Sequence, residues 1–147
     1  MKIVSAFAAV VILALGTTAV SSQQDPIAAR KAIMKANGQA AGGLAKMVKG
    51  EAPFDLPTAQ KAFATFEDAA AKMPALFPEN SKIGGETTAA PKIWEDTADF
   101  KAKFVKLSND AKSANASVKD LDTLKAAFPE LAKNCGGCHE LYRIKKS

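Results

Sequence analysis

Apolar residues recur at the spacing of an amphipathic helix in four segments of this 147-residue chain, and no useful length of sequence alternates as a strand would. The segments cover about residues 26–49, 58–73, 91–113 and 118–142. Aromatic residues make up only 7% of the chain, while alanine and lysine are abundant, and this composition favours helix over sheet. We therefore predict an all-α fold, an antiparallel four-helix bundle with one long connection.

Local signals predict where the first two helices begin and end. Asp25 is suited to cap the first helix, with Pro26 at its first position. Thr58 is suited to cap the second helix, which we expect to stop before Pro74 because the residue before a proline disfavours helical backbone.

Proline and glycine mark a long irregular connection at residues 74–91, and connections of this length are usually functional or flexible. A short break is expected at residues 114–117, before the last helix. Pro129 falls inside that last helix, where we expect it to produce a kink because proline lacks an N–H group.

The first 22 residues have the layout of a secretory signal peptide. Lys2 gives a positive start, residues 3–15 form an apolar run, and residues 16–22 are small and mostly polar. The alternative is a retained membrane anchor, but the run is shorter than the roughly 20 residues that a spanning helix needs. We predict that residues 1–22 are cleaved, which leaves residues 23–147 as one exported domain.

A compact motif stands near the end of the last predicted helix. Residues 135–139 read CGGCH, which is the attachment pattern of c-type haem. Residues three and four positions apart share one face of a helix, so Cys135, Cys138 and His139 project from the same side. Two thiols can then bind the vinyl groups of the porphyrin, and the adjacent imidazole can bind the iron.

Other readings of the motif fit the chain less well. A thioredoxin-like redox pair needs a strand before the motif and a helix after it. A zinc site needs a fourth ligand, but the chain holds only two cysteines and one histidine. A structural disulfide remains possible, although it does not explain the histidine that follows.

The sequence resembles the class II c-type cytochromes, the cytochrome c′ family, over most of its exported part. Residues 138–143 (CHELYR) match the C-terminal signature of the family, residues 49–55 (KGEAPFD) its first loop, and residues 91–94 (PKIW) the entry to its third helix. The resemblance implies a four-helix bundle with haem c attached near the C-terminus. It also implies a bacterial, periplasmic protein.

The same resemblance implies a ligand for the sixth coordination position of the iron. Counted back from the first loop, the arginine of the family's first helix falls on Arg30 and the sixth-site position on Met34. A methionine there is typical of the low-spin cytochrome c-556 branch, whereas cytochromes c′ proper leave the position open and bind small gases. Arg30, four residues earlier, is expected to pair with a haem propionate.

The residues alone leave alternatives open at both positions. A methionine on an apolar helix face is usually core filler, and Met47 and Met73 are competing thioethers. Arg30 can instead be a solvated side chain. We also expect the haem to be surrounded by four apolar side chains, namely Phe100, Phe104, Phe128 and Leu131.

The resemblance and the motif together predict a periplasmic electron-transfer protein with His139 and Met34 as iron ligands. The alternative is a five-coordinate protein that binds nitric oxide or carbon monoxide. An enzyme is not expected, because no second histidine is available for acid–base work. The partners implied are redox proteins of a respiratory or photosynthetic chain, and the protein is expected to be a monomer or a homodimer without stable membrane insertion.

The formal net charge is +5, with lysines mostly interleaved with acidic residues, and no nucleic-acid-binding motif accompanies it. We therefore expect no nucleic-acid partner. Four cations near the motif either steer an acidic redox partner or form a solvated tail, namely Lys133, Arg143, Lys145 and Lys146.

Overall fold

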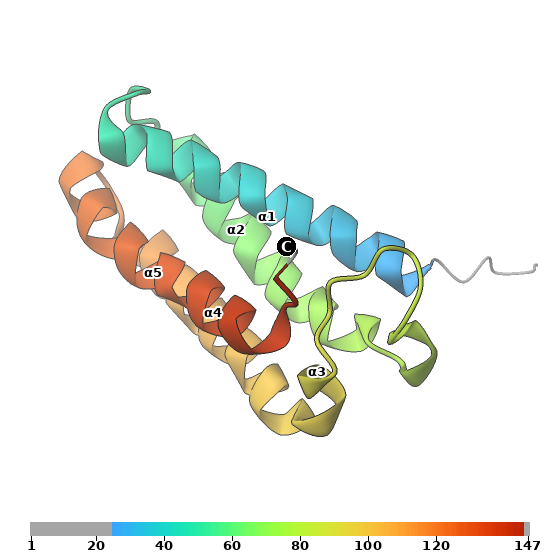
Figure 1. The fold of residues 1–147 in the computed structure, drawn as a ribbon. Helices are drawn as coiled ribbons and strands as arrows, with labels where there is room; N and C mark the ends of the chain where they lie inside the picture. Colours follow the sequence, from blue (N-terminus) through green and yellow to red (C-terminus); the bar gives the residue numbers. More distant parts are fainter. Residues whose placement is uncertain (1–24, 146–147) are drawn as a thin grey trace, which may run out of the picture.

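The computed structural model of the protein describes residues 25–145. Its elements are α1 (Pro26–Lys49), α2 (Leu56–Lys72), the short helical turns η1 (Met73–Leu76) and η2 (Glu79–Ser81), α3 (Lys92–Glu95), α4 (Thr97–Ser117) and α5 (Leu121–Tyr142). The four long helices form an antiparallel bundle in which α1 packs on α2 and α4 packs on α5 (Figure 1). The predicted all-α four-helix bundle is confirmed.

Two sequence predictions concern the signal peptide and the expected lack of stable membrane insertion. The predicted signal peptide, residues 1–22, lies outside the described residues. Between residues 25 and 145, no helix has the length and apolar character that a membrane span requires.

Helix α1 begins and ends where its sequence predicts. The Asp25 side chain accepts a hydrogen bond of 2.9 Å from the backbone N–H of Ile27, and Pro26 occupies the first turn. Gly50 ends the helix with a φ of 75°, in the left-handed region that glycine adopts without steric cost.

Helix α2 begins earlier than predicted. Its N-cap is Asp55, whose carboxylate accepts a 2.9 Å hydrogen bond from the backbone N–H of Thr58. Thr58, the predicted cap, therefore lies within the first turn. Pro57 fits that turn because the first N–H groups of a helix have no partner inside it.

The predicted third helix is in fact two helices. Asp96 interrupts it with φ −130° and ψ 60°, so α3 ends at Glu95 and α4 begins at Thr97. The Asp96 carboxylate then accepts a 3.3 Å hydrogen bond from the backbone N–H of Asp99 and caps α4. Apolar spacing alone missed the break, because it does not show that an aspartate side chain can bond to a backbone N–H group and so begin a new helix.

The break predicted at residues 114–117 is also misplaced. Helix α4 continues to Ser117, and α5 begins only at Leu121. A capping box sets this start, because the Asp120 carboxylate accepts from the backbone N–H of Thr123 and the Thr123 hydroxyl accepts from the backbone N–H of Asp120.

Pro129 lies inside α5, which continues through it to Tyr142. Proline cannot donate to the carbonyl oxygen one turn earlier, which belongs to Lys125. Lys125 is exposed, so water can serve that carbonyl group. Pro129 therefore does not end the helix that carries the motif.

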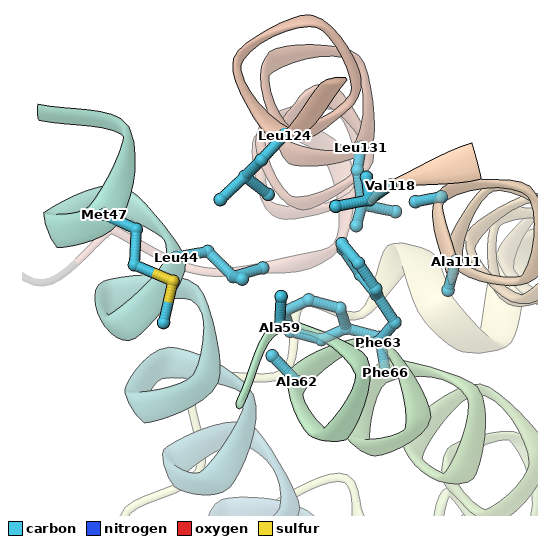
Figure 2. Packing of buried hydrophobic residues seen from close by; sticks show 11 residues of the cluster. Leu44, Met47, Ala59, Ala62, Phe63, Phe66, Ala111, Val118, Leu124 and Leu131 are labelled. Atoms are coloured by element: carbon cyan, nitrogen blue, oxygen red, sulfur yellow. The ribbon is translucent and has the colours of Figure 1, made fainter. Parts of the chain in front are cut away.

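Two clusters of buried apolar residues hold the bundle together. The first core cluster joins α1, α2, α4 and α5 around Phe63, Leu44 and Leu124, which are almost fully buried (Figure 2). The second core cluster, half of it aromatic, lies where α2, α3, α4, α5 and the long connection meet. It comprises Ala70, Met73, Ile93, Phe100, Phe104 and Tyr142.

The long connection is tied to the end of α5 by backbone hydrogen bonds. Ala90 donates to the carbonyl oxygen of Tyr142 over 3.0 Å, and Ile144 donates to that of Thr88 over 2.8 Å. Ala89 and Arg143 consequently form an isolated antiparallel bridge. We call these contacts the clasp, because they fix the connection beside the helix that carries the motif.

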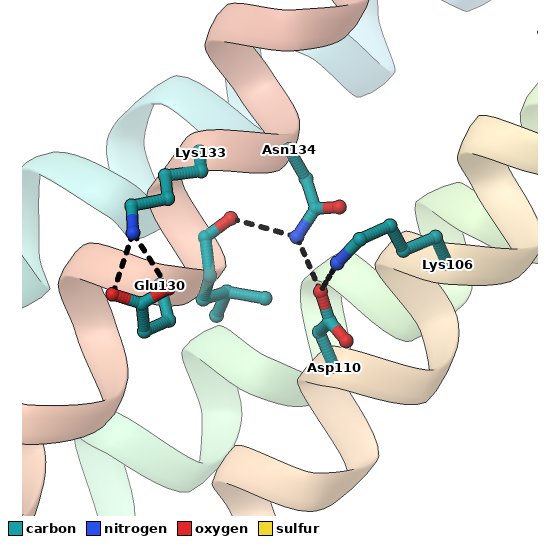
Figure 3. A network of polar contacts seen from close by, with 6 residues as sticks. Lys106, Asp110, Glu130, Lys133 and Asn134 are labelled. Carbon is teal, nitrogen blue, oxygen red and sulfur yellow. Dashed lines mark hydrogen bonds and ion pairs between the residues drawn. The ribbon is translucent and has the colours of Figure 1, made fainter.

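A polar contact joins α4 to α5 just before the motif. The Asn134 side chain donates a 2.7 Å hydrogen bond to the Asp110 carboxylate, which also binds Lys106 (Figure 3). Asn134 donates as well to the carbonyl oxygen of Leu131 over 3.0 Å. Asn134 therefore links the turn before Cys135 to α4.

Candidate functional site

A cavity of about 750 Å³ lies between α1, α4, α5 and the long connection. Its walls are largely apolar, because side chains of the second core cluster and its neighbours face it. These are Met73, Phe77, Ile93, Phe100, Phe104 and Leu107.

The four side chains predicted to attach the haem and hold its iron all line this cavity. Met34 reaches it from α1, and Cys135, Cys138 and His139 reach it from α5. Cys135 is exposed, whereas Cys138 and His139 are half-buried. Of the three residues of the motif, Cys135 is therefore the most accessible to solvent.

The competing methionines differ in their distance from this cavity. Met47 packs in the first core cluster and does not line the cavity. Met73 lines it but is only 2% exposed, within the second core cluster. Met34 is partly buried and packs against the same cluster. Among the methionines that the structure describes, Met34 and Met73 are therefore the two that line the cavity.

Burial sets the protonation of the motif's side chains. It lowers the pKa of His139, and the positive charge of Arg143 lowers it further. The imidazole is consequently neutral over a wider pH range, and a neutral imidazole has the lone pair that binds a metal. Burial also raises the pKa of the Cys138 thiol, which favours its protonated form.

Arg30 is a buried cation in the cavity wall, only 5% exposed. Its terminal nitrogens donate to the carbonyl oxygens of Leu76 and Ser81 over 3.1 and 2.7 Å. They also donate to the hydroxyl groups of Ser81 and Thr87 over 2.9 and 2.8 Å. The guanidinium lies 4.7 Å from the ring centre of Phe77.

All of these hydrogen-bond acceptors are uncharged. Burial lowers the pKa of Arg30, and only the more distant charge of Asp25 opposes this effect. A buried cation without a bound carboxylate is costly, so an anionic group in the cavity would be stabilised here. The same bonds hold the long connection in place, a role that the sequence did not reveal because the partners lie 46 to 57 residues away.

Two further polar residues of the site were missed by the sequence analysis. Asn37 lines the cavity one turn after Met34, and its Oδ1 atom is buried without a hydrogen-bond partner among the described residues. Tyr142 also lines it and donates a 2.5 Å hydrogen bond to Asp99. Loss of hydration and this bond raise the pKa of Tyr142. Asn37 lies three positions after Met34, and Tyr142 lies three positions after His139, so each shares a helix face with a predicted ligand. This spacing is the sequence signal that could have identified them as residues of the site.

The predicted apolar surroundings of the haem need a correction. Phe100 and Phe104 line the cavity, but Phe128 and Leu131 do not, because their side of α5 faces the first core cluster. Trp94 does not line it either. Its indole N–H donates to the carbonyl oxygen of Phe77 over 2.9 Å, which supports the wall from behind.

These features fit a covalently bound haem. The cavity is apolar where a porphyrin face needs apolar contacts, and two free thiols stand at helical spacing on one side. Arg30 offers a desolvated cation for a propionate, and a neutral imidazole lies next to the second thiol. Haem would supply two propionate carboxylates, two vinyl groups and iron, which are the groups that these residues can bind to give haem c.

A family model described as cytochrome c′ matches residues 25–143 of the chain. Cytochrome c′ of Rhodopseudomonas palustris is 46% identical over 136 residues, which cover 92% of this chain and 93% of that protein. Cytochrome c-556 of the same organism is 35% identical over 138 residues, which cover 91% of this chain and 93% of that protein.

Solved structures give the same result. Cytochrome c′ from Rhodopseudomonas palustris superposes with a TM-score of 0.83 at 49% identity, over 85% of this chain and all of the other. The NMR-validated model of oxidised cytochrome c556 from that organism superposes with a TM-score of 0.78 at 33% identity, over the same shares. The predicted cofactor, haem c, is confirmed, and the chain belongs to the cytochrome c′ family of electron-carrying haem proteins.

Proposed function

We propose that the protein is a low-spin electron carrier, in which His139 and Met34 are the axial ligands of the iron. The observation that carries the proposal is the cavity itself. Met34 lines it from α1, across from the helix that carries the attachment motif. Haem iron bound there supplies a one-electron cycle between the ferric and ferrous states.

The chain's own residues have distinct parts in this function. Cys135 and Cys138 would hold the porphyrin through thioether bonds, each formed by addition of an S–H group across a vinyl double bond. His139 and Met34 would both bind the iron, which would leave no coordination site open for substrate. Arg30 neutralises a propionate in the cavity wall, where its buried charge lacks a carboxylate partner.

This arrangement does not supply the groups of an enzyme. The only histidine of the chain is assigned to the iron, so no second imidazole is available for proton transfer. The relatives reported above are named as cytochromes. We propose electron transfer without catalysis, with redox proteins of a respiratory or photosynthetic chain as partners.

We place this carrier in the bacterial periplasm. The proposal rests on the signal-like layout of residues 1–22. It also rests on covalent haem attachment, which would occupy both cysteines in a compartment where free thiols are not kept reduced. Cleavage after residue 22 is expected to give a mature chain that begins at Gln23, and mass spectrometry of the exported protein tests this.

A second candidate is a five-coordinate protein that binds nitric oxide or carbon monoxide. Asn37 favours it, because its Oδ1 atom, buried and without a hydrogen-bond partner among the described residues, lies one turn from Met34 in the cavity wall. Hydrogen-bonding groups near the open side of a haem influence which small ligands bind. One of the similar proteins is also named cytochrome c′.

The absorption spectrum of the ferric, haem-loaded protein separates the two candidates. We expect a low-spin spectrum with a sulfur-to-iron charge-transfer band, which requires a thioether ligand. A high-spin ferric spectrum that responds to added carbon monoxide after reduction, without a lag for ligand dissociation, would favour the second candidate.

A further inference from the structure

Helix α1 carries an unusual charge distribution. Its 24 residues include five cations and no carboxylate, namely Arg30, Lys31, Lys35, Lys46 and Lys49. Residues 141–147 add three more cations and no acidic residue. In contrast, residues 50–140 contain eleven lysines and fourteen acidic residues. The positive charge of the protein is therefore concentrated on α1 and on the segment after α5.

These two positive segments meet at the cavity. Lys31 and Lys35 of α1 line it, as do Lys103 of α4 and Arg143 after α5, and we call these four residues the cationic rim. No aspartate or glutamate lines the cavity within the described chain. Together with Arg30 the lining holds five cations, which exceed the two carboxylates that a haem contributes.

Ion pairs neutralise the cationic rim only in part. Lys31 lies 3.7 Å from Glu86, and Lys103 lies 3.7 Å from Asp99, both in solvent-accessible positions where such pairs contribute little. Lys35 and Arg143 form no ion pair with any residue between 25 and 145. Their charges are consequently available to a partner.

Apolar side chains accompany the charge. Leu141 is 48% exposed and Ile144 is 49% exposed, and they flank Arg143 in sequence. Cys135, also exposed, lines the cavity together with Arg143, whereas Leu141 and Ile144 lie next to the cavity only through their place in the sequence. An exposed apolar surface next to unpaired cations is typical of a site that binds another protein.

We propose that the cationic rim is the docking surface for an acidic redox partner protein. This inference rests on the proposed electron-transfer function, since it places the partner beside the attached edge of the haem. We commit to an acidic partner on grounds of charge complementarity, because carboxylates on its surface would be attracted to the positive side chains of the cationic rim. A second copy of this chain would instead place like charges opposite each other.

The docking surface differs from the cluster that the sequence suggested. Lys133, one member of that cluster, binds both carboxylate oxygens of Glu130 over 2.7 Å and lines a different hollow, between α4 and α5. Arg143 stays in the surface, and Lys31 and Lys35 join it from more than 100 residues away. Only the fold brings these residues together.

The test is an NMR titration of the isotope-labelled, haem-loaded protein with poly-L-glutamate as the acidic probe. We expect chemical-shift changes at Lys31, Lys35 and Arg143 that disappear at high salt. The variant Lys31→Glu, Lys35→Glu is expected to weaken probe binding by roughly tenfold or more, as steering charges do at low ionic strength. A matched variant, Lys61→Glu, Lys125→Glu, reverses two exposed lysines outside the cavity and is expected to have a much smaller effect.

A kinetic measurement links the surface to electron exchange. Oxidation of the ferrous protein by ferricyanide should slow as salt is added, and oxidation by the cationic tris(phenanthroline)cobalt(III) should accelerate. Equal effects of the two double variants would overturn the proposal. So would shifts confined to α2, which carries no residue of the cationic rim, self-association through α1, or binding to anionic lipid vesicles without binding to poly-L-glutamate. A high-spin ferric spectrum would refute the proposed low-spin ligation by His139 and Met34, whereas the difference in probe binding between the two double variants would remain.

Discussion

At the scale of single residues, Met34 is the side chain that distinguishes the two proposed functions. Replacement of Met34 by alanine is expected to turn the ferric iron high-spin and to lower the reduction potential, because a thioether favours the ferrous state. Truncation of this partly buried side chain should lower the free energy of unfolding by about 2 kcal/mol, near the low end for core methionines. Absorption spectroscopy and potentiometry measure the first two effects.

The matched controls are Met73→Ala and Met47→Ala. Met73 lines the same cavity but is packed within the second core cluster, whereas Met47 lies in the first core cluster. Both variants should remain low-spin. A high-spin spectrum from Met73→Ala combined with a low-spin spectrum from Met34→Ala would show that Met73 is the ligand.

Arg30 offers a second prediction at the residue scale. The variant Arg30→Met removes four hydrogen bonds and leaves the carbonyl oxygens of Leu76 and Ser81 without this donor. We expect the unfolding free energy to fall by about 2 kcal/mol, because unsatisfied buried acceptors cost more than the desolvated charge relieves. Urea unfolding of the haem-loaded protein measures this change.

A conservative variant distinguishes charge from shape at this position. Arg30→Lys keeps the cation for a propionate but loses the planar fork that reaches Ser81 and Thr87 at once. It should preserve the reduction potential while hydrogen exchange accelerates in the connection. Unchanged exchange in both variants would contradict the holding role of Arg30.

The sequence predicted the residues of the motif better than the residues that support them. Cys135, Cys138 and His139 lie three and four positions apart, so helical geometry alone brings them to one side. The contacts of Arg30 and the position of Asn37 depend on the path of a long connection and on helix packing, which local patterns do not encode.

At the scale of elements, the contact between α4 and α5 depends on pH. Hydrogen bonds from Lys106 and from Asn134 lower the pKa of Asp110 in the folded state. The stabilisation is therefore present above the ordinary carboxyl pKa of about 3.9 and is lost as the pH falls through the lower folded value. Since the carboxylate is 34% exposed, solvent screening should keep the effect below about 1 kcal/mol.

Comparison of Asp110→Ala with the unsubstituted protein measures this contact. The difference in unfolding free energy should be largest near neutral pH and should shrink towards pH 3. Asp68→Ala serves as control, because Asp68 pairs with Lys72 at an exposed position of α2. A difference that grows on acidification would disprove the assigned sign.

Helix interiors were predictable from spacing, but several helix ends were not. Apolar side chains at helical intervals follow from burial, and they identified all four long helices. The ends at Asp96 and Asp120 depend on whether a carboxylate turns back to a backbone N–H group, which is a choice of a single side chain. Spacing carries no information on that choice.

At the scale of the whole molecule, the two core clusters predict how the protein behaves without haem. The variant Cys135→Ala, Cys138→Ala removes the covalent attachment and leaves a cavity of about 750 Å³ beside the second core cluster. We expect amide hydrogens near Phe100, Phe104 and Tyr142 to lose protection, because large cavities destabilise their surroundings. Amides around Phe63 and Leu124 should keep more protection, since none of the buried residues of the first core cluster lines the cavity.

Hydrogen exchange followed by NMR or mass spectrometry checks this difference between the two ends of the bundle. Thermal stability should also decrease markedly in the variant, because bound cofactor stabilises only the folded state. Full thermal stability without haem would contradict the prediction, as would uniform loss of protection in both clusters.

The clasp between the long connection and the end of α5 implies an order of events during maturation. Thr88 and Ile144 are separated by 56 positions, so their pairing closes a long loop and is expected to follow formation of the individual helices. Before that closure, residues 87–89, which line the cavity, are expected to lie away from the motif. The thiols of the motif are therefore expected to be accessible for attachment of the haem before residues 87–89 pack beside them.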